Sequence, residues 1–285
     1  MRRLVVLGSV SGAPGVTTTA LALTAAWPVE VDGGVRPVMV EADGSGGDLM
    51  IRFGLPTAPS LLDVAATARQ PYPGSLLGAA SELPCGVRTV VAVPGRGPCG
   101  QAVRLLASEA GLRVLRGESD ERGTVLLDLG RLGEDVQPLM DAADQVVLVT
   151  RGGAEPLTHV SAYGLDADRH AGRLMLAVVG PSPYPAEDIA SSLGVRHVAF
   201  LPWDARTVAA LNSLKPGALR SAGFRRPPLI AAARALACRL AEPQGTGAPA
   251  GAVEAEHLAG SHGAELAGQR HSGLAQAPGY GGSGS

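Results

Sequence analysis

Residues 3–18 read RLVVLGSVSGAPGVTT, an apolar run followed by a glycine-containing turn and then by threonines. The run at 3–8 is continuous and rich in β-branched side chains, which predicts a buried strand. Residues 17–27, TTTALALTAAW, favour a helix with threonine at its start. A strand, a tight turn and a helix in this order aim backbone N–H groups and a helix N-terminus at one point, which is how proteins bind phosphate. The alternative is an ordinary strand-to-helix turn that uses glycine for its backbone angles.

The same alternation continues along the chain. Further apolar runs predict strands at 37–42, 87–93, 123–129, 144–150, 173–179 and 197–201. Helical patterns lie between them at 60–69, 99–111, 133–142, 155–168 and 185–193, with a last one at 226–241. Continuous apolar strands that alternate with helices indicate an α/β fold, in which helices cover both faces of a mostly parallel twisted sheet.

Composition limits the class of protein. Of the 285 residues, 46% are hydrophobic and 18% are charged, which is typical of a globular domain. A net charge of −2 gives no overall attraction to nucleic acid or to an acidic membrane. No apolar run reaches 18 residues, so we expect no integral membrane segment. Three scattered cysteines without metal-ligand spacing indicate reduced thiols, and hence a cytoplasmic protein.

The composition changes near residue 242. Residues 242–285 are rich in Gly, Ala, Pro and Ser and have few large apolar side chains, so this tail is predicted to be disordered. We therefore expect a single folded domain over 1–241.

The turn itself, residues 11–18, is similar to the deviant Walker A motif of the ParA/MinD family, Lys-Gly-Gly-x-Gly-Lys-Thr-Thr. The residues that match this pattern are Gly12, Gly15, Thr17 and Thr18. Ser11 and Val16 stand where the family has its two lysines. The only lysine in the chain is Lys215, so no other lysine near the loop can substitute. Val16 is expected to pack where the stem of the lysine would have lain.

Three later segments extend the resemblance to residues 1–241. Residues 38–64 resemble the family segment with two carboxylates after its second strand; Glu41 replaces the first and Asp43 matches the second. The run 124–133 ends its apolar part in Asp128, like a Walker B strand. Residues 197–211 resemble the loop that borders the adenine base, here carried by Pro202 and Asp204 around Trp203, although Gly180 stands where the family has a base-reading asparagine.

The resemblance implies a ParA/MinD-type P-loop fold with ATP and Mg²⁺ as cofactors. It implies that Thr17, Asp43 and Asp128 would hold the magnesium ion, and that Asp43 would be catalytic if the site is active. A lost charge-assisted contact weakens phosphate binding by roughly 10- to 100-fold. Arg151 or Arg206 could supply the missing charge, but the sequence does not place either of them.

The first functional hypothesis is therefore a regulatory or positioning protein with a degenerate nucleotide site and weak or no ATP hydrolysis. The processes implied by the family are partitioning, septum placement and positioning of pilus or secretion machinery, the last as in the TadZ/CpaE branch. We expect protein partners and a possible homodimer. A basic cluster, Lys215 with Arg220, Arg225 and Arg226, allows DNA binding, but a solvated surface is the favoured interpretation.

Two other hypotheses stay open. One is an active ATPase that binds DNA as an ATP-dependent dimer in chromosome or plasmid partitioning. The other is a biosynthetic ligase of the same superfamily, but such enzymes keep the P-loop lysine and add substrate loops that this sequence does not contain.

Overall fold

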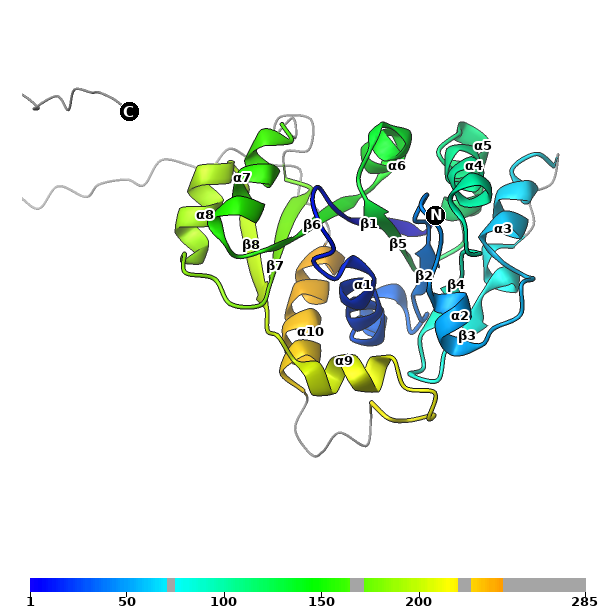
Figure 1. Ribbon diagram of the computed structural model, residues 1–285. Helices are drawn as coiled ribbons and strands as arrows, with labels where there is room; N and C mark the ends of the chain where they lie inside the picture. Colours follow the sequence, from blue (N-terminus) through cyan, green and yellow to red (C-terminus); the bar gives the residue numbers. More distant parts are fainter. Residues whose placement is uncertain (71–74, 165–171, 220–226, 243–285) are drawn as a thin grey trace, which may run out of the picture. The chain divides into compact units, whose positions relative to one another are not determined.

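The strands form one sheet in the order β3-β4-β2-β5-β1-β6-β7-β8, as Figure 1 shows. The computed structural model of the chain describes residues 1–70, 75–164, 172–219 and 227–242. Within this part, the strands are β1 (Arg3–Ser9), β2 (Val38–Glu41), β3 (Ser81–Glu82), β4 (Arg88–Val90), β5 (Thr124–Arg131), β6 (Gln145–Arg151), β7 (Leu174–Val179) and β8 (His197–Leu201). All neighbouring pairs are parallel except β3 with β4. The predicted mostly parallel sheet is confirmed.

Helices cover both faces of this sheet (Figure 1). In chain order they are α1 (Val16–Ala25), α2 (Leu49–Phe53), α3 (Leu61–Thr67), α4 (Arg96–Leu106), α5 (Glu109–Arg116), α6 (Gln137–Ala142), α7 (Ala154–Ala162), α8 (Ala186–Leu193), α9 (Ala205–Leu211) and α10 (Pro228–Ala241). Short 3₁₀ turns lie at Val29–Asp32, Leu76–Ala79 and Glu134–Val136.

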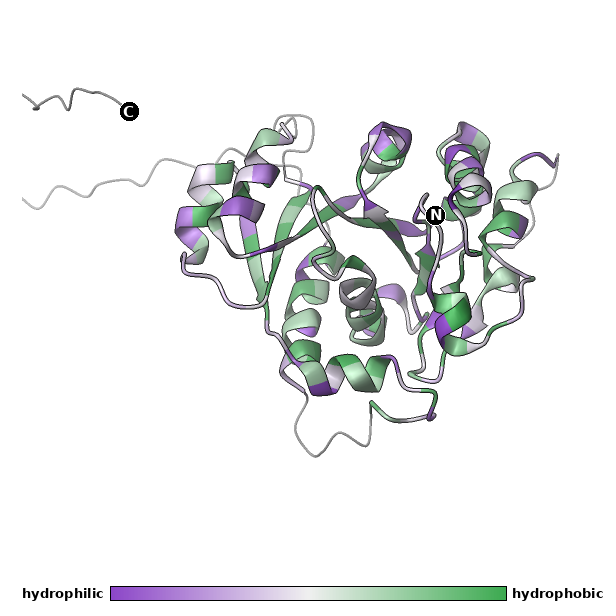
Figure 2. Cartoon of the chain, in the orientation of Figure 1, coloured by the Kyte–Doolittle hydropathy of each residue, from purple (hydrophilic) through white to green (hydrophobic). Residues whose placement is uncertain are grey.

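The side chains of each central strand alternate between two buried clusters. In β1, Leu4 and Val6 belong to one cluster, whereas Val5 and Leu7 belong to the other. The first cluster includes residues of α3 to α8, and the second includes residues of α1, α2, α9 and α10. Both faces of the central strands are therefore buried, which explains why the middle residues of these strands are apolar; green stretches mark them in Figure 2.

One predicted helix is wrong in its extent. Instead of a single helix at 99–111, α4 ends at Leu106 and α5 begins at Glu109. Ser108 caps α5, since its Oγ accepts a hydrogen bond from Gly111 N at 3.2 Å. A Cβ atom at Gly111 would lie 2.3 Å from the carbonyl oxygen of Leu105, so only glycine allows the two helices to meet this closely. The predicted strand at 87–93 is also shorter, because only Arg88–Val90 are paired as β4.

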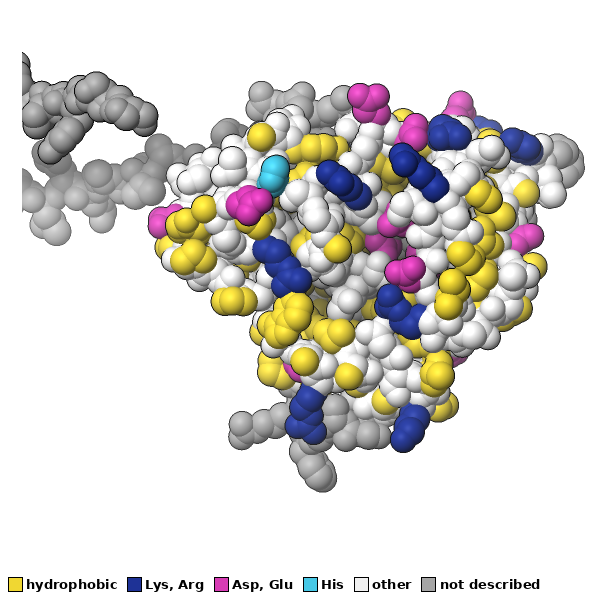
Figure 3. Space-filling view, viewed as in Figure 1, with side chains coloured by type: hydrophobic (Ala, Val, Ile, Leu, Met, Phe, Trp, Pro, Cys, Tyr) yellow, Lys and Arg dark blue, Asp and Glu magenta, His cyan; other side chains and the backbone are white. Residues whose placement is uncertain are grey.

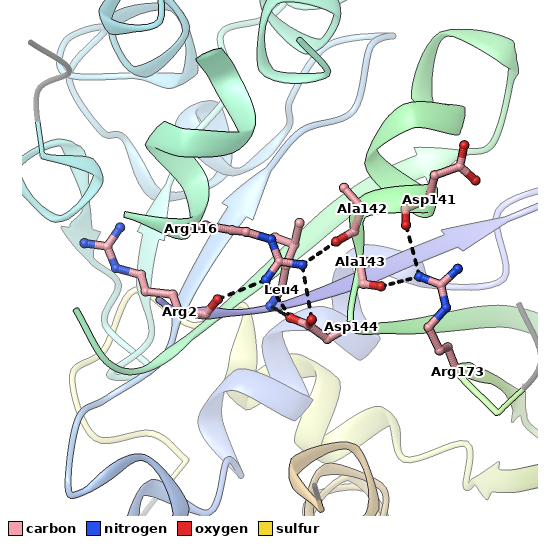
Figure 4. Close-up of polar contacts among 8 residues, drawn as sticks. All are labelled: Arg2, Leu4, Arg116, Asp141, Ala142, Ala143, Asp144 and Arg173. Atoms are coloured by element: carbon pink, nitrogen blue, oxygen red, sulfur yellow. Dashed lines mark hydrogen bonds and ion pairs between the residues drawn. The ribbon is translucent and has the colours of Figure 1, made fainter. Parts of the chain in front are cut away.

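Arginines fix the amino-terminal edge of the sheet (Figure 4). The Arg116 guanidinium donates to both carboxylate oxygens of Asp144, at 3.0 and 3.1 Å. Asp144 Oδ2 in turn accepts from Leu4 N at 2.7 Å. Arg173 donates to the carbonyl oxygens of Asp141 and Ala143. Arg116 thus links the end of α5 to the residue before β6, and Arg173 links the start of β7 to the turn between α6 and β6.

The chain separates into Met1–Gln244 and Gly245–Ser285. Apart from Glu242, the tail that is predicted to be disordered lies outside the described residues, as do Arg220, Arg225 and Arg226 of the basic cluster. None of the helices that the structure describes has the length and apolar character needed to cross a bilayer.

Candidate functional site

The turn between β1 and α1 lies at the carboxyl end of the central strand, where ligands bind in open α/β sheets. Gly12 and Gly15 have φ angles of 61° and 101°, which side chains other than glycine rarely adopt. Gly15 precedes the first residue of α1, and no side chain caps the helix there. The N–H groups of the first turn of α1 are thus left without a side-chain cap, as an anion-binding helix start requires. Pro14 has no N–H to contribute.

Val16 opens α1 with its side chain turned into the core. It is 6% exposed and belongs to the same buried cluster as Leu7 and Val149. Val16 is thus buried at the helix start; its packing along the path of a lysine stem stays a prediction. Ser11, at the other lysine position, is half-buried in the turn. Neither position therefore brings a positive charge to the loop.

The loop faces a group of acidic residues across the end of β1. Asp128 of β5 is in register with Leu7 of β1 and with Glu41 of β2, and it is fully buried. Its Oδ1 accepts from Gly130 N at 3.0 Å, whereas its Oδ2 is buried without a hydrogen-bond partner. Burial raises the pKa of Asp128 to about 7, although the nearby Thr17 hydroxyl and the hydrogen bond from Gly130 N–H oppose the shift.

Asp43 lies beside this carboxylate. Its Oδ1 accepts from the backbone N–H and the hydroxyl of Ser45, at 2.8 and 2.7 Å. Its Oδ2 is so close to Gly130 that a Cβ atom there would lie 1.9 Å from it. The negative charges of Asp43 and Glu41 contribute to the raised pKa of Asp128. The structure thus brings together Thr17, Asp43 and Asp128, the three residues that the sequence predicts as magnesium ligands.

Both carboxylate oxygens of Glu41, the residue before this acidic pair in the chain, accept hydrogen bonds from the backbone. Its Oε1 accepts from the N–H groups of Asp48 and Leu49 at 2.9 and 3.1 Å, and its Oε2 accepts from Ala92 N at 3.0 Å. Burial raises its pKa, and these three hydrogen bonds oppose the rise. The carboxylate joins the ends of β2 and β4 to the start of α2, and both of its oxygens are used in doing so.

Thr17, Asp43 and Asp128 fit a magnesium ion that also binds phosphate. Mg²⁺ is usually held by one or two carboxylates together with phosphate oxygens and water. The unpartnered Oδ2 of Asp128 is the kind of buried oxygen that a hydrated cation satisfies. Among the described residues no group of three His, Cys, Asp or Glu side chains could hold a metal alone. Acidic side chains gather near the middle of the face that Figure 3 shows.

On the other side of the loop lies a cavity of about 290 Å³. It is lined by Ser11, Gly12, Ala13, Pro14, Arg151, Glu155, Pro156 and His159. Arg151 ends β6, and its guanidinium carbon lies 4.5 Å from the centroid of the Trp203 ring. Of the two arginines that could replace a loop lysine, Arg151 therefore lies at the loop, whereas Arg206 is exposed in the first turn of α9 and does not line this cavity.

Pro202 and Asp204, predicted to border the adenine base, follow β8 at the same edge of the sheet. The carboxylate of Asp204 caps α9, since its Oδ1 accepts from Thr207 N at 3.0 Å, and its Oδ2 accepts from the hydroxyl of the same residue. Burial alone would raise the pKa of Asp204, but these hydrogen bonds hold it below its usual range. Asp204 is thus engaged in the protein, and Gly180 leaves no side-chain amide at the end of β7.

Similarity to known proteins is evident in the structure alone. No protein-family model matches the sequence, and no curated protein matches it significantly. Among solved structures, the septum site-determining protein MinD of Pyrococcus horikoshii, complexed with Mg-ADP, aligns over 85% of this chain and 95% of its own, with a TM-score of 0.61 and 18% identity. The chain has the ParA/MinD fold. The ATP complex of a Cyanothece McdA variant covers 86% of this chain and 99% of its own (TM-score 0.58, 18% identity). A ParA family ATPase from Chlorobium tepidum covers 82% and 98% (TM-score 0.54, 13% identity).

Proposed function

We propose that this chain is a cytoplasmic positioning or regulatory protein of the ParA/MinD type that binds Mg-nucleotide weakly and hydrolyses it slowly or not at all. The observation that carries the proposal is the buried Val16 at the start of α1, opposite intact magnesium-side residues. Backbone N–H groups and the helix dipole can still bind a phosphate. They do not replace a preorganised cation at the developing charge, whose loss typically costs about 100- to 1000-fold in rate.

In this proposal the chain acts by binding other proteins and not by hydrolysing nucleotide. A protein that exchanges nucleotide without efficient turnover can change its shape or its dimeric state on binding and signal to a second protein. The structural neighbours include a MinC:MinD complex from Aquifex aeolicus, which is a partner-bound protein of this fold. Partners, a homodimer and a role in septum, partition or pilus positioning are accordingly part of the proposal, whereas DNA binding is not favoured.

Calorimetry with ATP and ADP in the presence of Mg²⁺, together with a phosphate-release assay, tests the proposal. We expect measurable but weak binding and no release above the rate of the Asp43→Ala variant. A fluorescent fusion of the full chain should then localise to discrete sites in cells rather than spread uniformly. Uniform fluorescence together with an absence of nucleotide binding would contradict the proposal.

An active ATPase is the second candidate, and the assembled Thr17, Asp43 and Asp128 favour it. It predicts phosphate release that is abolished by Asp43→Ala and stimulated by DNA. Turnover at a rate that needs Asp43 would replace the first proposal with this one.

A further inference from the structure

Among the described residues that line the cavity beside the loop without lysines, Arg151 is the one that carries a guanidinium. Arg151 is half-buried at the carboxyl end of β6, which pairs directly with β1. Among the described residues it has no carboxylate partner, in contrast to Arg116 at the opposite edge of the sheet. Its guanidinium lies against the aromatic face of Trp203. A cation that is stacked but not neutralised remains available to an anion.

The cavity beside the loop connects this cation with the phosphate-binding turn. Ser11 to Pro14 form one wall, and Arg151 forms part of another. The acidic group in the cavity is Glu155, which is exposed in the first turn of α7, and His159 lies one turn further. Exposed charges are screened by solvent and salt, so Glu155 lowers the local positive potential without neutralising the half-buried guanidinium.

We propose that Arg151 supplies the positive charge of this phosphate-binding loop, and that Trp203 is the positioning residue that holds its guanidinium there. The inference depends on the proposed binding of Mg-nucleotide and adds the residue that makes the binding possible. A guanidinium presents several N–H donors in a planar fork, so it can stack on an aromatic face and still donate along its edge to phosphate oxygens.

The arrangement also indicates which phosphates Arg151 contacts. Asp43 and Asp128 lie on one side of the loop, where a magnesium-bound phosphate end would sit, and Arg151 lies on the other side with Trp203. A polyphosphate that crosses the loop has its magnesium end at the carboxylates and its other end at the guanidinium. Trp203, 65% exposed, then lies at the nucleoside end of the ligand.

Binding by the full chain tests this inference with three probes: Mg-ADP, inorganic pyrophosphate with Mg²⁺, and adenosine. Arg151→Gln should weaken the binding of ADP and pyrophosphate by roughly 10- to 100-fold and leave adenosine unchanged. Arg151→Lys should recover part of the loss. Trp203→Ala should weaken ADP binding less than Arg151→Gln does. Arg239→Gln is the matched control, because Arg239 is an exposed arginine in the last turn of α10, away from the loop.

The outcomes show whether Arg151 contacts the phosphate groups, the nucleoside or neither. If wild type binds ADP and Arg151→Gln binds it equally well, Arg151 does not contact phosphate and the inference is wrong while the proposed function stands. Equal losses for adenosine and ADP also overturn it, since Arg151 would then contact the nucleoside. If wild type binds none of the phosphate probes, the nucleotide part of the proposed function fails and the inference fails with it. Melting temperatures close to that of wild type confirm that the variants are folded.

Discussion

Two neighbouring regions at the carboxyl edge of the sheet differ in the groups that they could offer to a phosphate ligand. The acidic side, Thr17 with Asp43 and Asp128, has the side chains that a magnesium–phosphate complex needs. The loop side, Ser11 to Val16, has the backbone geometry for phosphate but neither lysine. Both regions lie at the ends of neighbouring strands of one sheet, so the difference between them lies in single side chains and not in the fold.

The comparison shows that the backbone shape of the turn does not depend on the positive charge of a lysine side chain. The turn keeps its form because Gly12 and Gly15 provide the backbone angles and Val16 packs in the core. A valine at this position satisfies packing as well as a lysine stem would, but it contributes nothing to an anion. The backbone form of the turn therefore does not require a lysine.

The largest expected effect is the loss of stability when Glu41, which holds the backbone next to the acidic side, is replaced. Glu41→Ala removes the acceptor of three backbone N–H groups and should lower the free energy of unfolding by about 3–5 kcal/mol. Urea denaturation measures it. Glu82→Ala is the control; its ion pair with Arg36 is exposed, so the loss should stay below about 1 kcal/mol. Similar losses for the two variants would show that Glu41 is not the support that the geometry indicates.

Adding the missing charge to the loop side is the next test. In Val16→Lys the stem can follow the core while the ammonium reaches the loop, so ATP affinity should rise by roughly 10- to 100-fold. Overpacking should lower stability by about 1–3 kcal/mol. Val16→Met, a long uncharged side chain at the same position, should be destabilised without the gain in affinity. Calorimetry and thermal melting separate the two effects, and equal affinities would mean that the loop cannot use a cation from this position.

The buried carboxylate of the acidic side predicts a dependence of stability on pH. The pKa of Asp128 is about 7 in the folded chain but about 4 when exposed, so the folded state holds a proton that the unfolded state has lost. This contribution to the free energy of unfolding should fall by about 1 kcal/mol per pH unit as the pH rises from 5 to 7, and it should level off above 7. Urea denaturation at each pH gives the free energy of unfolding of the wild type and of Asp128→Asn. The difference between the two proteins at each pH isolates the contribution of the Asp128 carboxyl group. A difference in the free energy of unfolding that stays constant with pH would show that the pKa of Asp128 is not raised in the folded chain.

The smallest effect concerns the orientation of Asp43. Ser45→Ala removes one of two hydrogen bonds to Asp43 Oδ1, because the Ser45 N–H still donates. We expect a loss of about 0.5–1.5 kcal/mol in Mg-ATP affinity by calorimetry. Ser213→Ala is the control and should change nothing, because the Ser213 hydroxyl lies beyond the end of α9 and accepts from Lys215 N. A loss as large as that of Asp43→Ala would mean that the Ser45 hydroxyl itself is a ligand.

The parallel strands were largely predictable because each is built on a continuous apolar run, whereas β3 (Ser81–Glu82) is a short polar strand that no apolar pattern indicates. The boundary between α4 and α5 was not predictable either, since it depends on how closely Gly111 approaches Leu105 across the turn. Helix α9 was also missed. It is a short segment that begins where the Asp204 carboxylate caps it, within a stretch read only as part of a loop.

For the site, the sequence by itself determined the glycine turn, the carboxylates at strand ends and the absence of lysine, because motif spacing and residue type carry these properties. Only the tertiary structure decided that Glu41 is used by backbone N–H groups, that Asp128 has an unpartnered oxygen, and that Arg151 stacks on Trp203 beside the loop. The physical reason is that partners distant in the chain meet only when parallel strands align their carboxyl ends. Burial and pairing then set the charge of each group, and no local pattern encodes them.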